Sequence, residues 1–386
     1  MLLFSCGMVR SGSTVQYQIA VELVESHNLG MTIGWISNPN SEILEVLQSV
    51  TKRRDKYLIL KCHDYTTAAG QLVELGAAKA VYIYRDLRDV AVSLGHKFFE
   101  SVDAALASGL LERSLANYYG WTSTRKLMIS RYESMMDDLK QEVTDVASYL
   151  KVNCSEAKIS KIAEKFSIGA QKQRIEAFNY SKHGIAGSGG DAYDPVSQLH
   201  NHHIQSGEWG QWKEALTPEQ IEWIEHRAFS WLVDRGYPLL TFQFKDSSKK
   251  SAEDYYKQGQ RLHSKGKHVE AITACRQAIM LSPQKSNFHH FLGKLLFQTE
   301  DYAAAMLAYR HALALKPRSQ SYRRGLGEAL VKTNHLAEAI DVYEGAIQSR
   351  PSDPSLYAEL AEIFVLQHRL EEANNCLKKA FTLSRK

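Results

Sequence analysis

The sequence predicts an α/β fold, a parallel sheet flanked by helices, followed by an all-α repeat array. Three observations support this. Up to about residue 240, apolar runs with strand character alternate with amphipathic helical patterns, which is typical of a parallel sheet covered by helices. A glycine-rich loop follows the first apolar run. In the last third of the chain, prolines recur every 34 residues, at Pro283, Pro317 and Pro351.

The apolar runs predict the strands of the sheet. They cover residues 2–6, 31–36, 57–62, 80–84 and 126–130, and an amphipathic segment follows each of them. Sheets of this kind bind ligands beyond the C-terminal ends of their strands. The residues directly after each run are therefore the candidates for a functional site.

The first run leads into a loop that matches a phosphate-binding loop except for its lysine. Gly7, Gly12 and Thr14 fit the spacing G-x-x-x-x-G-K-[ST], but Ser13 stands where the lysine belongs. The cation of this loop is Arg10. A glycine-rich turn before a helix favours phosphate, whereas the missing lysine disfavours hydrolysis of ATP or GTP. The loop therefore predicts a different phosphorylated donor.

Two later strand ends add charged and titratable groups. Lys61 and His63 close the third run, Arg85 follows the fourth run, and Ser93 comes eight residues after Arg85. Because parallel strands end at the same edge, these side chains are expected to converge with the loop. The edge is then suited to a multiply anionic ligand beside one imidazole.

These residues resemble the motifs of sulfotransferases that use 3′-phosphoadenosine 5′-phosphosulfate (PAPS). Residues 9–14 resemble the 5′-phosphosulfate loop, and residues 81–93 resemble the 3′-phosphate motif. Residues 61–63 are similar to the K-T-H of the cytosolic branch, residues 132–133 to its Y-E pair, and residues 207–213 to G-x-x-G-x-W-K. The resemblance covers the whole first domain.

The resemblance implies in-line transfer of the sulfuryl group from PAPS to a hydroxyl or amine. His63 is then the general base, Arg10 stabilises charge on the bridging and sulfuryl oxygens, and Lys61 binds the sulfuryl group. No metal is required. The residues implied to bind the donor are Arg10, Ser11, Gly12, Ser13, Thr14, Arg85, Ser93, Tyr132 and Gly207.

The chain also departs from the family's pattern. Val15 stands in place of the tryptophan that stacks on adenine, and Gln205 and Ser206 replace the basic pair before Gly207. Either His202 or His203 is a candidate for the lost positive contact.

Four features of this domain admit other interpretations. Cys62 beside His63 suggests a Cys–His pair, but neighbours on a strand point to opposite faces, so we assign Cys62 to the core. Asp86 could hold magnesium as in nucleotide hydrolases, which the missing loop lysine disfavours. Residues 200–203 could bind a metal or form a solvated loop, and residues 184–190 could be a lid or a surface connection.

Composition restricts the classes of partner and compartment. A formal charge of +4 is too small to indicate nucleic-acid binding by itself. The five cysteines have neither disulfide-framework nor metal spacing, which favours a reducing compartment. No 18-residue apolar run and no leader pattern are visible. We therefore expect a cytoplasmic protein without a membrane span.

The proline spacing in the last third equals the tetratricopeptide period. Small residues recur at the helix crossings, as glycine at 259, 293 and 327 and as alanine at 271, 305, 339 and 373. We predict a first domain over 1–242, a linker over 243–251 and repeats over 252–285, 286–319, 320–353 and 354–386.

Two roles for the repeats stay open. They can recruit a protein partner, or a small-molecule, glycan or protein acceptor, to the enzyme, since stacked repeats form an extended binding surface. They can instead serve only to dimerise or stabilise the chain. A different class of function is also compatible with the sequence: a non-catalytic interaction scaffold that carries a nucleotide-binding domain.

Overall fold

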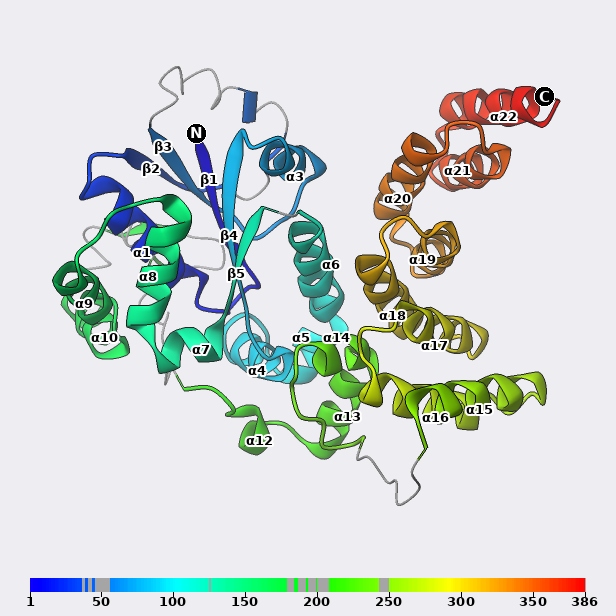
Figure 1. Ribbon diagram of the computed structural model, residues 1–386, viewed down its shortest axis with the longest axis horizontal. Coiled ribbons are helices and arrows are strands. Elements are labelled where there is room, and N and C mark those ends of the chain that lie inside the picture. Colours follow the sequence, from blue (N-terminus) through cyan, green and yellow to red (C-terminus); the bar gives the residue numbers. More distant parts are fainter. Residues whose placement is uncertain are drawn as a thin grey trace. The chain divides into compact units, whose positions relative to one another are not determined.

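The computed structural model describes residues 1–36, 39–40, 44–45, 56–124, 126–178, 184–186, 192–193, 199, 208–242 and 250–385. The chain divides into two compact units, Met1–Thr217 and Pro218–Lys386. Figure 1 labels most of their helices and strands.

The first unit is built on a parallel sheet with the strand order β2-β3-β1-β4-β5. Each strand lies within two residues of a predicted run, so the predicted fold class is confirmed. β1 is central and entirely buried, whereas the edge strand β2 alternates between partly buried and exposed residues. The bounds are β1 Leu2–Gly7, β2 Gly30–Trp35, β3 Tyr57–Lys61, β4 Ala78–Tyr84 and β5 Leu127–Arg131.

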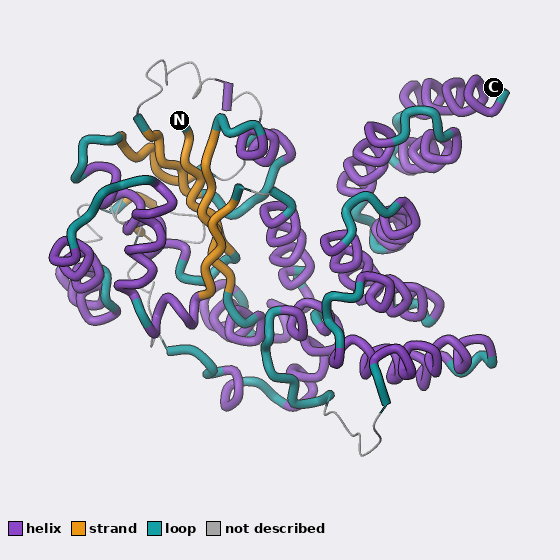
Figure 2. Tube along the Cα trace, in the orientation of Figure 1, coloured by secondary structure: helices purple, strands orange, loops and turns teal. Residues whose placement is uncertain are grey.

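Helices cover both faces of this sheet (Figure 2). Successive residues of β1 point to opposite faces: Leu3 joins the core formed with α1 (Ser13–Glu25), α8 (Leu139–Leu150) and α9 (Glu156–Lys165). Phe4 packs against the fully buried Trp121 of α6 (Leu110–Thr122), with ring centroids 5.5 Å apart. The remaining elements of this unit are α3 (Thr67–Glu74), α4 (Leu87–Phe98), α5 (Val102–Ala107), α7 (Tyr132–Asp137), α10 (Ile168–Ala177), β6 (Ile185–Ala186), β7 (Ala192–Tyr193) and α12 (Trp212–Ala215).

The second unit contains four helical pairs with the predicted period. Small residues permit the close crossings: a Cβ at Gly293 would lie 2.7 Å from the Tyr309 ring, and one at Gly327 would lie 2.5 Å from the Tyr343 ring. The pairs are α15 (Ala252–Ser264) with α16 (His268–Leu281), α17 (Ser286–Gln298) with α18 (Tyr302–Leu315), α19 (Gln320–Lys332) with α20 (Leu336–Ser349), and α21 (Pro354–Leu366) with α22 (Leu370–Ser384).

Two further helices, α13 (Pro218–Arg227) and α14 (Phe229–Asp234), pack on the repeats rather than on the sheet. His226 of α13 is hydrogen-bonded to Asp301 at 2.8 Å and to Arg276 at 3.0 Å, and Phe229 lies under the Arg276 guanidinium. When the units are defined by the contacts within the structure, the unit that contains the repeats therefore begins at Pro218. The domain boundary that we predict from the sequence, at residue 242, stays a prediction.

Most of the predicted linker, residues 243–249, lies outside the described residues. The first repeat begins with a capping box, in which Ser251 and Asp254 satisfy each other's backbone N–H groups. Among the helices that the structure describes, none is both long enough and apolar enough to cross a lipid bilayer.

Two buried histidines in the repeats predict acid-sensitive packing. His289 and His311 are 0% and 2% exposed, with ring centroids 4.3 Å apart and with Asp234 3.8 Å from His311. Burial lowers the pKa of His289 to about 4 and that of His311 well below its ordinary value, although Asp234 opposes the shift at His289. Because the unfolded chain then binds more protons, the free energy of unfolding should fall between pH 6.5 and pH 4, by about 2 kcal/mol at pH 5 for His289 alone.

Urea unfolding of the full chain at pH 7 and pH 5 measures this difference. The variant His289→Gln cannot titrate, so its loss between the two pH values should be smaller than that of the wild type. Equal losses in the two proteins would show that His289 does not contribute.

Candidate active site

The loop between β1 and α1 takes the shape that its glycines predict. Gly12 adopts a left-handed conformation, φ 78°, at the start of α1, and a Cβ there would lie 2.6 Å from the Tyr132 ring. Arg10 is also left-handed, with φ 65°. Such a conformation costs a non-glycine residue roughly 1–3 kcal/mol and often occurs at functional sites.

The hydroxyl of Ser11 holds the loop against the sheet. It lies 2.6 Å from the carbonyl of Met8 and 3.1 Å from that of Ile83 at the end of β4, and Met8 N–H donates to the same Ile83 carbonyl. Ser13 and Thr14 follow as the buried first residues of α1. The hydroxyl proton of Ser11 is therefore used within the loop.

One group of predicted residues converges beside this loop. Arg10 Nε donates to Ser93 Oγ at 2.8 Å, and Arg85 donates to the Arg10 carbonyl at 3.4 Å. The Arg85 guanidinium also lies 4.4 Å from the centre of the Tyr132 ring. The buried Nε of Arg85 has no hydrogen-bond partner among the described residues. Four residues thus meet, from the loop, from the position directly after β4, from α4 and from α7, and the cationic Arg85 keeps one donor unused.

The sequence does not single out Asp89, which connects the G-x-x-G-x-W-K segment, residues 207–213, to this group through hydrogen bonds at Gly210 and Trp212. Asp89 lies 3.5 Å from Arg85, and its carboxylate accepts the backbone N–H groups of Gly210 at 2.6 Å and Trp212 at 3.1 Å. Arg85 also donates to the Glu208 carbonyl at 2.9 Å. The i,i+4 spacing of Arg85 and Asp89 is a signal that could have found it. Gly207, His202 and His203 lie outside the described residues.

Lys61 lies on the other side of the loop, at the end of β3. Its ammonium donates to Thr14 Oγ1 at 2.6 Å, and the side chain is buried. Burial, with a smaller contribution from the nearby charge of Arg10, lowers the pKa of Lys61 to about 7. Arg10 is therefore close enough to Lys61 to influence its charge, and an anion bound here would restore the charge of Lys61.

The imidazole of His63 is oriented by the loop. Nδ1 lies 2.7 Å from the carbonyl of Gly7. Because a carbonyl only accepts, Nδ1 carries the proton and Nε2 is left as the basic nitrogen. Loss of solvation, followed by the charge of Lys61, lowers the pKa of His63 to about 4, against the opposing hydrogen bond to Gly7. At neutral pH the ring is therefore in its basic form.

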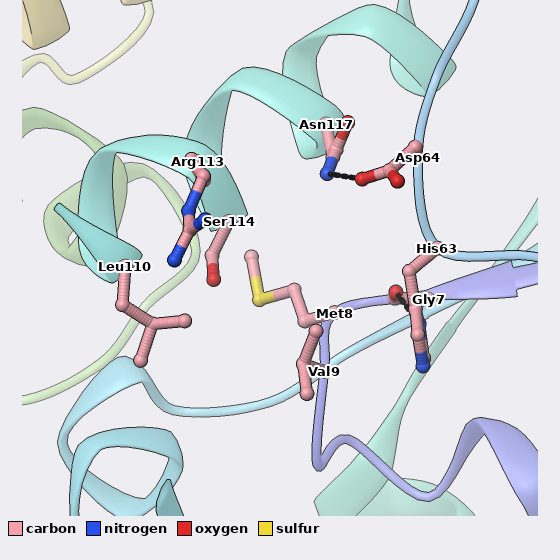
Figure 3. Close-up of a pocket in the computed structure, with 9 residues that line it drawn as sticks. All are labelled: Gly7, Met8, Val9, His63, Asp64, Leu110, Arg113, Ser114 and Asn117. Carbon is pink, nitrogen blue, oxygen red and sulfur yellow. Dashed lines mark hydrogen bonds between the residues drawn. The ribbon is translucent and has the colours of Figure 1, made fainter. Parts of the chain in front are cut away.

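A cavity of about 220 Å³ opens beside His63. Figure 3 shows its lining, which comes from the start of the loop and the end of β3 on one side and from α6 on the other. Arg113, Ser114 and Asn117 supply its polar groups on α6. We predict no site residue on α6 from the sequence, because an amphipathic helix gives no local sign of which cavity it borders.

Two alternative interpretations are decided by packing. Cys62 is fully buried, with its sulfur 3.7 Å from that of Cys6, which confirms its assignment to the core. Asp86 caps α4 and forms an ion pair with Arg88 at 2.7 Å, so its carboxylate has a structural use. That no metal is required stays a prediction. Residues 200–203 and most of 184–190 lie outside the described residues.

Comparison with known families identifies both parts of the chain. The sulfotransferase domain family matches residues 3–232, and the chain belongs to this family. Tetratricopeptide repeats match residues 291–354 and 324–374. Both resemblances seen in the sequence are thereby confirmed. The family match ends inside α14, so in sequence α13 and most of α14 are part of the sulfotransferase domain. In the structure, the same two helices are part of the unit that contains the repeats.

Individual proteins are more distant. The chain is similar to the amine sulfotransferase of Oryctolagus cuniculus, with 25% identity over 164 residues, which cover 38% of this chain and 51% of that protein. The chain thus spans about half the length of this curated relative. Among solved structures, MamA MSR-1 C2 is 20% identical, with TM-score 0.34, and the match covers 43% of this chain and 91% of that chain. MamA 41-end from Desulfovibrio magneticus RS-1 is 21% identical, also with TM-score 0.34, over 42% and 93% of the two chains.

Proposed function

We propose that the protein transfers the sulfuryl group of PAPS to a hydroxyl or amine, with His63 as general base. The observation that carries this proposal is the position of one loop between two groups of residues. Arg85 and Ser93 contact Arg10 of the loop from the β4 side, whereas Lys61 and His63 contact Thr14 and Gly7 from the β3 side.

Donor binding is assigned to the first group and to the loop itself. Arg85 and Ser93 hold the 3′-phosphate, which the unused buried Nε of Arg85 supports. The loop and first helical turn, Ser11 to Thr14, hold the 5′-phosphate through backbone N–H groups and through the hydroxyls of Ser13 and Thr14. Tyr132, already stacked under Arg85, contacts the adenine. Gly207 remains part of this proposal by resemblance only.

The chemical step breaks the bond between sulfur and the bridging phosphate oxygen and forms a bond from sulfur to the acceptor. His63 Nε2 takes the acceptor's proton. Lys61 and Arg10 stabilise negative charge on the sulfuryl oxygens and on the leaving phosphate oxygen, an electrostatic contribution that is often the largest in such reactions. No step in this scheme uses a metal.

The repeats are assigned a recruiting role toward a protein partner or a glycan, protein or small-molecule acceptor. A cytoplasmic location also belongs to the proposal. It is supported by the five cysteines, all of which are free, three of them fully buried.

The donor assignment predicts selective nucleotide binding. The product nucleotide, 3′-phosphoadenosine 5′-phosphate, should bind at least about 100-fold more tightly than ATP, because ATP lacks the 3′-phosphate and each charge-assisted hydrogen bond contributes about 1.5–3 kcal/mol. Isothermal titration calorimetry measures both affinities. Ser93→Ala removes one donor to the 3′-phosphate together with the acceptor of the Arg10 Nε–H, and should bring the two affinities closer together. Equal affinity for ATP would overturn the assignment of PAPS.

A further inference from the structure

We propose that the acceptor carries an anionic group, such as a carboxylate, which binds Arg113 while the reacting hydroxyl or amine faces His63. This inference rests on the proposed sulfotransferase function and adds the chemical class of the acceptor. It is argued from the cavity beside His63 and the charges that line it.

The cavity is small and has two distinct ends. At about 220 Å³ it is below the 300–1,000 Å³ typical of sites for drug-sized ligands, so it suits a small molecule or the terminal group of a larger one. Figure 3 shows His63 and Arg113 on opposite sides of the lining, with Met8 and Val9 between them. An acceptor that reaches both ends therefore contacts apolar side chains along its middle.

Arg113 provides an unpaired positive charge at one end. Its side chain is exposed on the first turn of α6, and its guanidinium has neither a hydrogen bond nor an ion pair among the described residues. A guanidinium binds a carboxylate through two parallel hydrogen bonds, which gives orientation as well as affinity. The Arg113 guanidinium is thus available to bind a molecule in the cavity.

Asp64 determines which end of the acceptor lies beside His63. It follows His63 directly, and Asn117 fixes it by donating to Oδ1 at 3.1 Å while accepting the Tyr65 N–H at 2.9 Å. The oriented carboxylate accepts a hydrogen bond from a hydroxyl or N–H of the acceptor and repels an anion. The anionic group of the acceptor is therefore directed away from His63 and toward Arg113.

Matched acceptors test the inference: 4-hydroxyphenylacetate and its methyl ester, and an amine pair built in the same way. With labelled PAPS, wild-type kcat/KM should favour each acid over its ester at least tenfold. Arg113→Gln should bring this ratio close to one. The matched control Lys161→Gln removes one exposed positive charge on α9, on the other face of the sheet, and should keep the wild-type ratio. Calorimetry with 3′-phosphoadenosine 5′-phosphate verifies the fold of both variants.

Each failure has a separate meaning. Equal use of acid and ester by the wild type, or an unchanged ratio in Arg113→Gln, would overturn the anionic acceptor and leave the sulfotransferase proposal standing. Labelling of material in a cell extract but of none of the four compounds would also count against this class of acceptor. If no sulfate leaves PAPS with the four compounds and none with a cell extract, the proposed function itself fails.

Discussion

His63→Asn is expected to lower kcat by about 10²- to 10⁴-fold, the range that a general base contributes. Asparagine suits this test because its amide N–H can replace the Nδ1–H that donates to the Gly7 carbonyl. It lacks the basic Nε2. The substitution therefore removes the proton acceptor and retains the contact between β3 and the loop.

The pH profile of kcat/KM separates a base from a merely structural histidine. With the pKa of His63 at about 4 and that of Lys61 at about 7, the wild-type value should fall below pH 4, where His63 is protonated, and above pH 7, where Lys61 loses its charge. In His63→Asn the acidic limb should disappear. Near-normal kcat in this variant, with 3′-phosphoadenosine 5′-phosphate still bound, would exclude His63 as the base.

Arg10→Asn is expected to lower kcat by about 10²- to 10³-fold, the loss seen when one preorganised donor to a developing negative charge is removed. Asparagine tolerates the left-handed backbone of position 10 better than most residues, so the loss reports on charge rather than on loop strain. Single-turnover rates at saturating PAPS measure this loss apart from binding.

Two further variants identify what Arg10 does. Arg10→Lys keeps the charge but not the planar donor set, and should recover only part of the rate. Ser93→Ala removes the 2.8 Å hydrogen bond to Arg10 and tests whether that contact positions the guanidinium. A variant Arg10→Asn that binds donor weakly but turns over normally would make Arg10 a phosphate ligand and not a stabiliser of the leaving group.

The sequence predicts the strands well because each is a short apolar run bounded by polar residues. For β1, β3 and β4, burial on both faces demands such runs. It does not predict their spatial order. Apolar periodicity says which residues are buried but not which strand lies beside which, and here β1, the first in the chain, is central.

For the site, sequence motifs locate Arg10, Lys61, His63 and Arg85, and the structure brings these residues around one loop. The sequence predicts that these strand ends meet, but not which atoms are in contact. Nε2 of His63 is free because Nδ1 donates to the Gly7 carbonyl, 56 residues away in the chain. The hydrogen bonds from the backbone of residues 210 and 212 to Asp89 join segments more than 120 residues apart. Arg113 belongs to no motif, and only the cavity distinguishes it from other surface arginines.

The packing of α13 and α14 has a practical consequence for work on the repeats. These helices lie at the end of the region that matches the sulfotransferase domain family, yet Phe229 and Trp231 are buried and belong to the repeat-containing unit. A chain cut at residue 251 would expose those aromatic rings to water and lose the His226 contacts with Arg276 and Asp301. Truncation would then report on solubility as much as on recruitment. The repeats are therefore not a separate module that can be removed or replaced without α13 and α14. Their partner is better sought with point substitutions in the intact chain.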